Sequence, residues 1–188
     1  MASSNKNSLE FFYKYFSTIS SAIAEIDVAK LNEAANIFLK ASNTGGKIIF
    51  IGNGGSAAMS SHLSIDLTKA ANIRAINFNE ADLLTCFAND YGYEHWVARA
   101  LEFYADKNDV VVLISSSGKS QNIINGAAQA RNMGLSIITL SGFDSKNPLR
   151  ELGQVNFWCD SDAYNVVEMT HHVWLLSIVD FIIHVRPA

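Results

Sequence analysis

The sequence predicts an α/β fold of three layers, in which helices flank a five-stranded parallel sheet. Five short apolar segments alternate with segments of helical periodicity along the 188 residues. Hydrophobic residues make up 49% of the chain, which is enough to fill such a core and excludes a disordered chain. Short apolar strands separated by helices favour parallel pairing, because helices then cover both faces of the sheet.

The individual elements are assigned from changes of hydrophobic period. Two amphipathic helices are expected between Leu9 and about Ala41, with Asp27 as a cap between them. The strands are expected at Lys47–Ile51, Ile73–Asn77, Asp109–Ile114, Leu135–Leu140 and Val155–Cys159. Helical segments are expected from the first strand to about Ala70 and at Glu80–Ala88, Glu94–Phe103, Ser120–Met133 and Ala163–His184.

The chain is expected to form a single domain over residues 1–188. Only two prolines occur and no Pro/Gly/Ser-rich linker is present, so nothing marks a boundary. Residues 1–43 are the N-terminal helical pair, and residues 44–188 form the sheet with its flanking helices. The aromatic residues of the first helix exceed what one helix face can bury, so this pair is expected to serve in oligomerisation. They are Phe11, Phe12, Tyr13, Tyr15 and Phe16.

Charge and composition exclude several classes of partner. The formal net charge of −4 argues against a nucleic-acid-binding domain, which usually carries a basic face. Two cysteines without a CxxC pattern fit a reducing compartment. The polar start Met1–Ser8 does not resemble an export signal, and no apolar run approaches the roughly 20 residues of a membrane-spanning helix. A cytoplasmic protein without nucleic-acid or membrane partners is expected.

A glycine-rich loop, Gly52-Asn53-Gly54-Gly55-Ser56, connects the first strand to its helix. Its glycines allow positive φ and close backbone approach, so amide groups can converge on an anion at a helix N-terminus. The loop matches neither GxGxxG nor GxxxxGK[ST], so nucleotide-binding fingerprints do not apply. The alternative interpretation is a tight turn with a serine cap.

A serine-rich loop, Ser115-Ser116-Ser117-Gly118-Lys119-Ser120, connects the third strand to its helix. Several hydroxyl and amide donors at one helix N-terminus suit a phosphate dianion. The alternative is a serine-rich connection in which Ser117 or Ser120 only caps the helix. In parallel sheets ligands bind at the carboxyl ends of strands, where both loops are expected to lie. A phosphorylated metabolite is favoured over ATP.

Three motifs together resemble the sugar isomerase (SIS) domain family, and within it the phosphoheptose isomerases that act on sedoheptulose 7-phosphate. They are the glycine-rich loop followed by His62, the segment Ala88-Asn89-Asp90-Tyr91-Gly92-Tyr93, and the segment Ile114–Ser120. The resemblance extends from about residue 8 to residue 184. It implies a flavodoxin-like five-stranded parallel sheet and a homotetramer with sites built at subunit interfaces.

The resemblance also implies roles for individual residues. Ser115, Ser116, Ser117 and Ser120 would bind the phosphate of the sugar. The sugar itself would lie against the glycine-rich loop, with a second pair of residues close by. These residues are Asn53, Gly54 and Ser56 in the loop, and Asn89 and Asp90 in the pair.

Aldose–ketose isomerisation needs an acid and a base. The family carries a histidine and, four residues on, a glutamate, and here these positions hold His62 and the shorter Asp66. On the last helix, Val167 and Leu175 occupy the family's glutamine and catalytic histidine positions. His171 lies between them on the same face. His62, Asp66 and His171 are therefore the predicted catalytic residues. The alternative is that His171 and the adjacent His172 are partly buried helix residues at a subunit contact.

Several members of the family bind zinc through these four positions. Val167 and Leu175 offer no ligand, so the set is incomplete and no metal or other cofactor is expected. The predicted function is isomerisation of a ketose phosphate and an aldose phosphate, with sedoheptulose 7-phosphate as the expected substrate. The alternative is a non-catalytic SIS module that binds a sugar phosphate, or a partner protein, as a sensor or scaffold.

Overall fold

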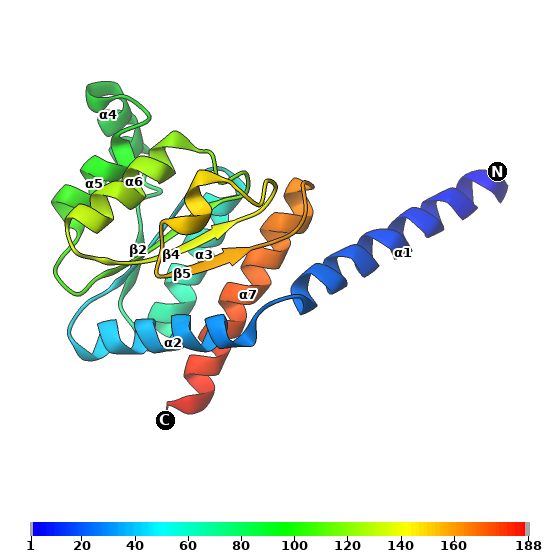
Figure 1. Cartoon of the computed structure of the whole chain (residues 1–188), viewed down its shortest axis with the longest axis horizontal. Coiled ribbons are helices and arrows are strands. Elements are labelled where there is room, and N and C mark those ends of the chain that lie inside the picture. The colour runs from blue at the N-terminus through cyan, green and yellow to red at the C-terminus, as the bar shows by residue number, and fades with distance from the viewer. Residues whose placement is uncertain (1, 187–188) are drawn as a thin grey trace.

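A five-stranded parallel sheet forms the centre of the molecule, with the strand order β2-β1-β3-β4-β5 (Figure 1). The structure is a computed structural model that describes residues 2–186, so the outermost residues of the predicted domain lie outside the described residues. The strands are β1 (Ile48–Gly52), β2 (Ala75–Asn77), β3 (Val110–Ser115), β4 (Ser136–Ser141) and β5 (Val155–Trp158). The predicted fold class is confirmed.

Helices cover both faces of the sheet and give the molecule its three layers (Figure 1). One face is covered by α2 (Val28–Asn43), α3 (Gly55–Lys69) and α7 (Tyr164–Val185). The other is covered by α4 (Ala81–Tyr91), α5 (Trp96–Tyr104), α6 (Gln121–Asn132) and the short 3-10 helix η1 (Pro148–Glu151). The strands are apolar throughout because both of their faces are buried.

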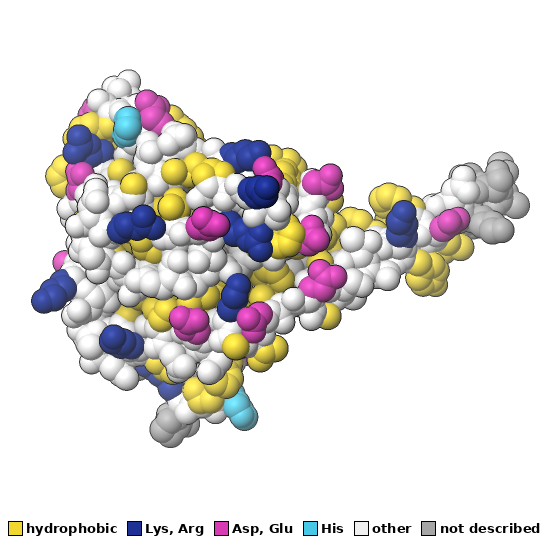
Figure 2. Space-filling model, viewed as in Figure 1, with side chains coloured by type: hydrophobic (Ala, Val, Ile, Leu, Met, Phe, Trp, Pro, Cys, Tyr) yellow, Lys and Arg dark blue, Asp and Glu magenta, His cyan; other side chains and the backbone are white. Residues whose placement is uncertain are grey.

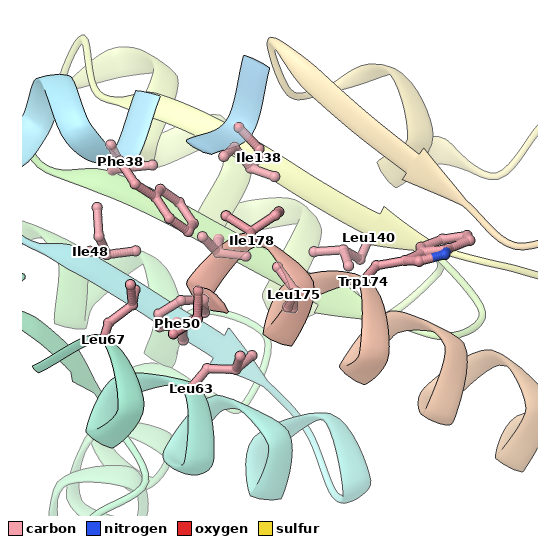
Figure 3. Close-up of a cluster of buried hydrophobic side chains, with 14 of the residues drawn as sticks. Phe38, Ile48, Phe50, Leu63, Leu67, Ile138, Leu140, Trp174, Leu175 and Ile178 are labelled. Carbon is pink, nitrogen blue, oxygen red and sulfur yellow. The ribbon is translucent and has the colours of Figure 1, made fainter. Parts of the chain in front are cut away.

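The core of the α2, α3 and α7 face is built from alternate residues of the strands. Phe50 of β1, Leu63 of α3 and Leu175 of α7 belong to this cluster, and all three are at most 1% exposed (Figure 3). Within the described residues, α7 is the one helix long and apolar enough, by length and composition alone, to cross a membrane. Its buried side packs on the sheet, which accounts for its apolar composition.

The helix α1 (Ala2–Ala24) projects from the body of the molecule (Figure 1). Its C-terminal end is held on α7, where the indole N–H of Trp174 donates to the carbonyl of Ile23 at 3.0 Å. Asp27 begins α2 as predicted, since its carboxylate accepts the N–H of Ala29 at 3.0 Å. Hydrophobic side chains stand exposed along α1 (Figure 2).

The structure differs from the predicted elements at several of their ends and by one additional element. The polar residues before Leu9 continue α1 back to Ala2. β2 begins at Ala75, because only three residues pair with β1 while Ile73 is buried in the core beside them. The 3-10 helix η1 was not predicted; Asn147 caps it by accepting the N–H of Arg150 at 3.1 Å.

Candidate functional site

A small pocket of about 120 Å³ opens where β1 and β3 end. The structure brings the two predicted loops together there, as expected for strands that end at one edge of a parallel sheet. Both loops lead into helices, α3 and α6, whose N-terminal amide groups face this edge. The lining residues are Asn53, Ser56, Ile114, Ser115, Ser116, Ser117, Ser120, Tyr164 and Glu168.

One hydroxyl of the serine-rich loop has no hydrogen-bond partner within the described residues. Ser120 occupies the N-cap position of α6 but makes no capping bond with its side chain. Its hydroxyl instead accepts the Ser115 hydroxyl at 3.0 Å. Ser116 is only 6% exposed, and its buried hydroxyl has no hydrogen-bond partner among the described residues. A buried polar group left without a partner costs about 1–3 kcal/mol, which a bound anion would offset.

The glycine-rich loop is shaped by its backbone. Gly54 is the N-cap of α3 with φ of 54°, a left-handed conformation that glycine adopts readily. Gly55 lies against the carboxylate of Glu168, and a Cβ at this position would collide with it. The predicted alternative of a serine cap does not hold, because α3 has no side-chain cap and Ser56 is buried instead.

Asn53 is held in one orientation by two residues that were not predicted to contact it. Its amide exchanges two hydrogen bonds with the amide of Asn122, at 3.0 and 2.9 Å. The hydroxyl of Tyr93 donates to the Asn53 carbonyl oxygen at 3.1 Å. These bonds tie the glycine-rich loop to α6 and to the connection between α4 and α5. Glu168, a third residue absent from the predicted set, lines the pocket directly.

Asn89 and Asp90 do not reach this pocket within the subunit. Both are exposed on α4, where the Asn89 amide donates to the Asp90 carboxylate at 2.9 Å. α4 has no buried residue and lies at the edge of the molecule (Figure 1). Their predicted role at the sugar stays a prediction that depends on another subunit.

His62 and Asp66 form a cluster with His172, on the outer side of α3 and α7. Nε2 of His62 lies 3.1 Å from Asp66 Oδ2, and Nδ1 of His62 lies 2.9 Å from Nε2 of His172. Desolvation, and then the neighbouring His62, lower the pKa of His172 below its ordinary value. The cluster is partly exposed and does not line the pocket of its own subunit.

The structure does not bring His171 to the acid–base cluster, which corrects the predicted catalytic set. His171 is fully buried, and its Nε2 donates to the carbonyl of Ser141 at 3.0 Å. Burial lowers its pKa to about 4, so the imidazole is neutral near pH 7. The face of α7 that holds Val167, His171 and Leu175 packs on the sheet, whereas His172, one residue on, faces His62.

The three clustered side chains do not form a zinc ligand set as they are arranged. His62 presents one ring nitrogen to Asp66 and the other to His172, so the three cannot share one ion through His62. Tetrahedral zinc requires at least three protein donors directed at one point. No group of three or more His, Cys, Asp or Glu side chains within residues 2–186 has such an arrangement.

A three-layer α/β fold with two donor-rich loops at one sheet edge is an arrangement suited to binding an anion. Comparison with known proteins agrees: the family model of the SIS domain matches residues 11–142. The chain belongs to the SIS domain family.

Within the SIS domain family, three proteins similar to this chain are phosphoheptose isomerases. The phosphoheptose isomerase of Helicobacter hepaticus is 35% identical over 156 residues, which cover 79% of this chain and 78% of that protein. The phosphoheptose isomerase of Cytophaga hutchinsonii is 37% identical over 117 residues, 60% of this chain and 61% of that protein. The structure of the phosphoheptose isomerase of Neisseria gonorrhoeae superimposes with a TM-score of 0.84 at 25% identity, covering 95% of this chain and 98% of that one.

Proposed function

We propose that this chain is an aldose–ketose isomerase of phosphorylated sugars, with sedoheptulose 7-phosphate as its substrate. The observation that carries the proposal is Ser116, a lining residue of the pocket before the N-terminus of α6, whose buried hydroxyl has no partner among the described residues. A phosphoryl oxygen would satisfy this donor and gain from the helix dipole. The named relatives, which are phosphoheptose isomerases, support the same assignment.

The chemistry requires proton transfer and no redox partner. A base removes the proton from the carbon beside the carbonyl, an enediol forms as the carbonyl oxygen gains a proton, and a proton returns to the neighbouring carbon while a hydroxyl proton is lost. Substrate and product are isomers, so no other reactant is consumed. Phosphate binding remote from these carbons supplies energy that fixes the reacting end.

The cluster of His62, Asp66 and His172 supports the acid–base step, with His172 in place of the predicted His171. Asp66 accepts a hydrogen bond, so Nε2 of His62 carries the proton and Nδ1 accepts from Nε2–H of His172. Nδ1 of His172 then holds a lone pair that can take up a proton. His172 with its lowered pKa is neutral near pH 7 and is therefore ready to act as a base.

We further propose a homotetramer, in which the cluster of one subunit completes the pocket of another. Two observations support it: the cluster lies outside its own pocket, and exposed apolar residues surround it on the outer side of α3 and α7. Ile65, Met169 and Val173 are 61%, 44% and 40% exposed. The aromatic residues of α1 offer a second unpartnered surface, on which Phe11, Phe12 and Phe16 are more than half exposed.

We propose a cytoplasmic location, which is supported by the acidic charge and by Cys86 and Cys159, both free thiols.

The alternative of a non-catalytic sensor or scaffold is not better supported by the comparisons. It rests on the replaced positions Val167 and Leu175, whose side chains are core residues here.

Proton NMR of the purified protein with sedoheptulose 7-phosphate tests the function. We expect new anomeric signals of a heptose phosphate, and none from unphosphorylated sedoheptulose at the same concentration. His172→Gln should lower the rate at least a hundredfold and leave binding in place. Binding without conversion by the wild-type protein would instead support the non-catalytic alternative.

A further inference from the structure

We propose that His171 is a positioning residue that braces the phosphate-binding loop through the end of β4. The inference rests on the proposed function, because it assigns the purpose of the brace to phosphate binding. His171 does not touch the pocket, and it acts through the backbone of Ser141 and Gly142.

The brace begins at a fully buried hydrogen bond. His171 Nε2 donates to the carbonyl oxygen of Ser141 at 3.0 Å, and the same oxygen accepts the N–H of Cys159 at 2.9 Å. The last residue of β4 is thereby held by β5 on one side and by α7 on the other. A second contact from α7 lies beside it: Val167 packs so closely on Gly142 that a Cβ at Gly142 would stand 2.8 Å from its methyl groups.

From Gly142 the brace passes directly to the serine-rich loop. The N–H of Gly142 donates to the carbonyl oxygen of Ser116 at 2.8 Å. Ser116 lines the pocket, and its buried hydroxyl has no hydrogen-bond partner among the described residues. The peptide unit between Ser141 and Gly142, with one hydrogen bond at each end, therefore links the imidazole on α7 to the backbone of Ser116, the residue assigned to the phosphate.

Packing alone does not account for a histidine at this position. Nδ1 of His171 is buried and has no hydrogen-bond partner among the described residues, which is unfavourable. Leucine would fill similar space without an unpaired polar atom, and the next residue of this face, Leu175, is a leucine that is 1% exposed. The Nε2–H bond to Ser141 is what leucine would lack.

Three variants separate positioning from packing. His171→Leu removes the donor and keeps apolar bulk. His171→Gln retains an N–H donor at the place of Nε2, and Leu175→Ala opens a cavity on the same face without touching Ser141. Hydrogen exchange of the peptides covering Ser115–Ser120 and Gly142 is measured in each variant, together with the Kd for sedoheptulose 7-phosphate below the melting temperature of all variants.

We expect His171→Leu to speed exchange in both segments and to raise the Kd about tenfold. His171→Gln should restore both to within about threefold of the wild type, and Leu175→Ala should lower the melting temperature without changing either. The proposal would be overturned if His171→Leu left exchange in the two segments unchanged. It would also be overturned if Leu175→Ala increased this exchange as much as His171→Leu does. A wild-type protein that binds no sugar phosphate would contradict the proposed function, while the exchange measurements would still decide whether His171 braces the loop.

Discussion

At the scale of single residues, Ser116 and His171 share one feature: each has a buried polar atom without a hydrogen-bond partner among the described residues. At Ser116 the unpartnered atom belongs to a residue that lines a pocket, which favours a ligand there. At His171 the unpartnered atom is Nδ1, while Nε2 donates to the Ser141 carbonyl. This indicates that the bond to Ser141 offsets the unfavourable free energy of burying Nδ1 without a partner. The same physical cost therefore points to binding in one place and to positioning in the other.

The buried imidazole gives a pH-dependent stability with a definite sign. The pKa of His171 is about 4 in the folded protein and about 6.5 when unfolded, so the unfolded state takes up a proton that the folded state refuses. The contribution of the neutral His171 to the free energy of unfolding is fully present well above pH 6.5, and it is lost as the pH drops toward 4. Between pH 7 and 4.5 the wild type should lose about 2–3 kcal/mol more than His171→Gln in urea unfolding. Equal losses in both proteins would show that His171 is not buried as neutral imidazole.

The residues of the two loops were predictable, whereas their supports were not. Glycines and serines between a strand and a helix are a local signal, and all four predicted serines line the pocket. Asn122 and Tyr93 lie 69 and 40 residues away from Asn53, and nothing in the sequence marks them as its partners. Glu168 is not among the predicted site residues, and its place beside Gly55 follows from how α7 packs on α3.

At the scale of elements, the buried strands were predictable and the rotation of α7 was not. Strands covered on both faces are apolar throughout, a pattern that survives in sequence. α7 has nine buried residues and also exposes Met169, Val173 and Phe181, so apolar residues occur all round the helix. Without a polar face, periodicity cannot show which of His171 and His172 faces the sheet.

The arrangement of α3 against α7 also leads to a prediction about metal. Because His62 divides its two ring nitrogens between Asp66 and His172, we expect substoichiometric zinc in the purified protein. Chelators should leave its melting temperature unchanged. Elemental analysis that finds one zinc per subunit, lost in His172→Ala but retained in His171→Gln, would contradict this arrangement.

At the scale of the whole molecule, the projecting α1 explains the aromatic excess seen in the sequence. Tyr15 and Phe16 pack edge to face with ring centroids 6.0 Å apart, yet Phe16 remains 61% exposed. That two N-terminal helices exist was predictable, but that the first leaves the body of its own subunit was not, since amphipathicity does not show which chain covers a helix face.

Light scattering tests the proposed assembly. At micromolar concentration we expect a mass four times that of one chain. The double variant Phe12→Ser with Phe16→Ser should reduce the mass, because each substitution removes roughly 1.5–3 kcal/mol of the free energy gained by burying apolar surface in a contact. Val28→Ser, an exposed apolar residue at the start of α2, is the matched control and should leave the mass unchanged. A monomeric wild-type protein would refute the tetramer and leave the acid–base cluster without a pocket to serve.

Titration calorimetry with sedoheptulose 7-phosphate tests most directly whether the serine-rich pocket binds the phosphoryl group of a sugar. Ser116→Ala removes the unpartnered hydroxyl, and Ser136→Ala removes a hydroxyl at the opposite end of the sheet as its control. We predict that Ser116→Ala weakens binding by about 1–2 kcal/mol, the scale of a lost hydrogen bond to a charged group, and that Ser136→Ala leaves the affinity unchanged. An affinity that Ser116→Ala does not alter would contradict phosphate binding at the serine-rich pocket.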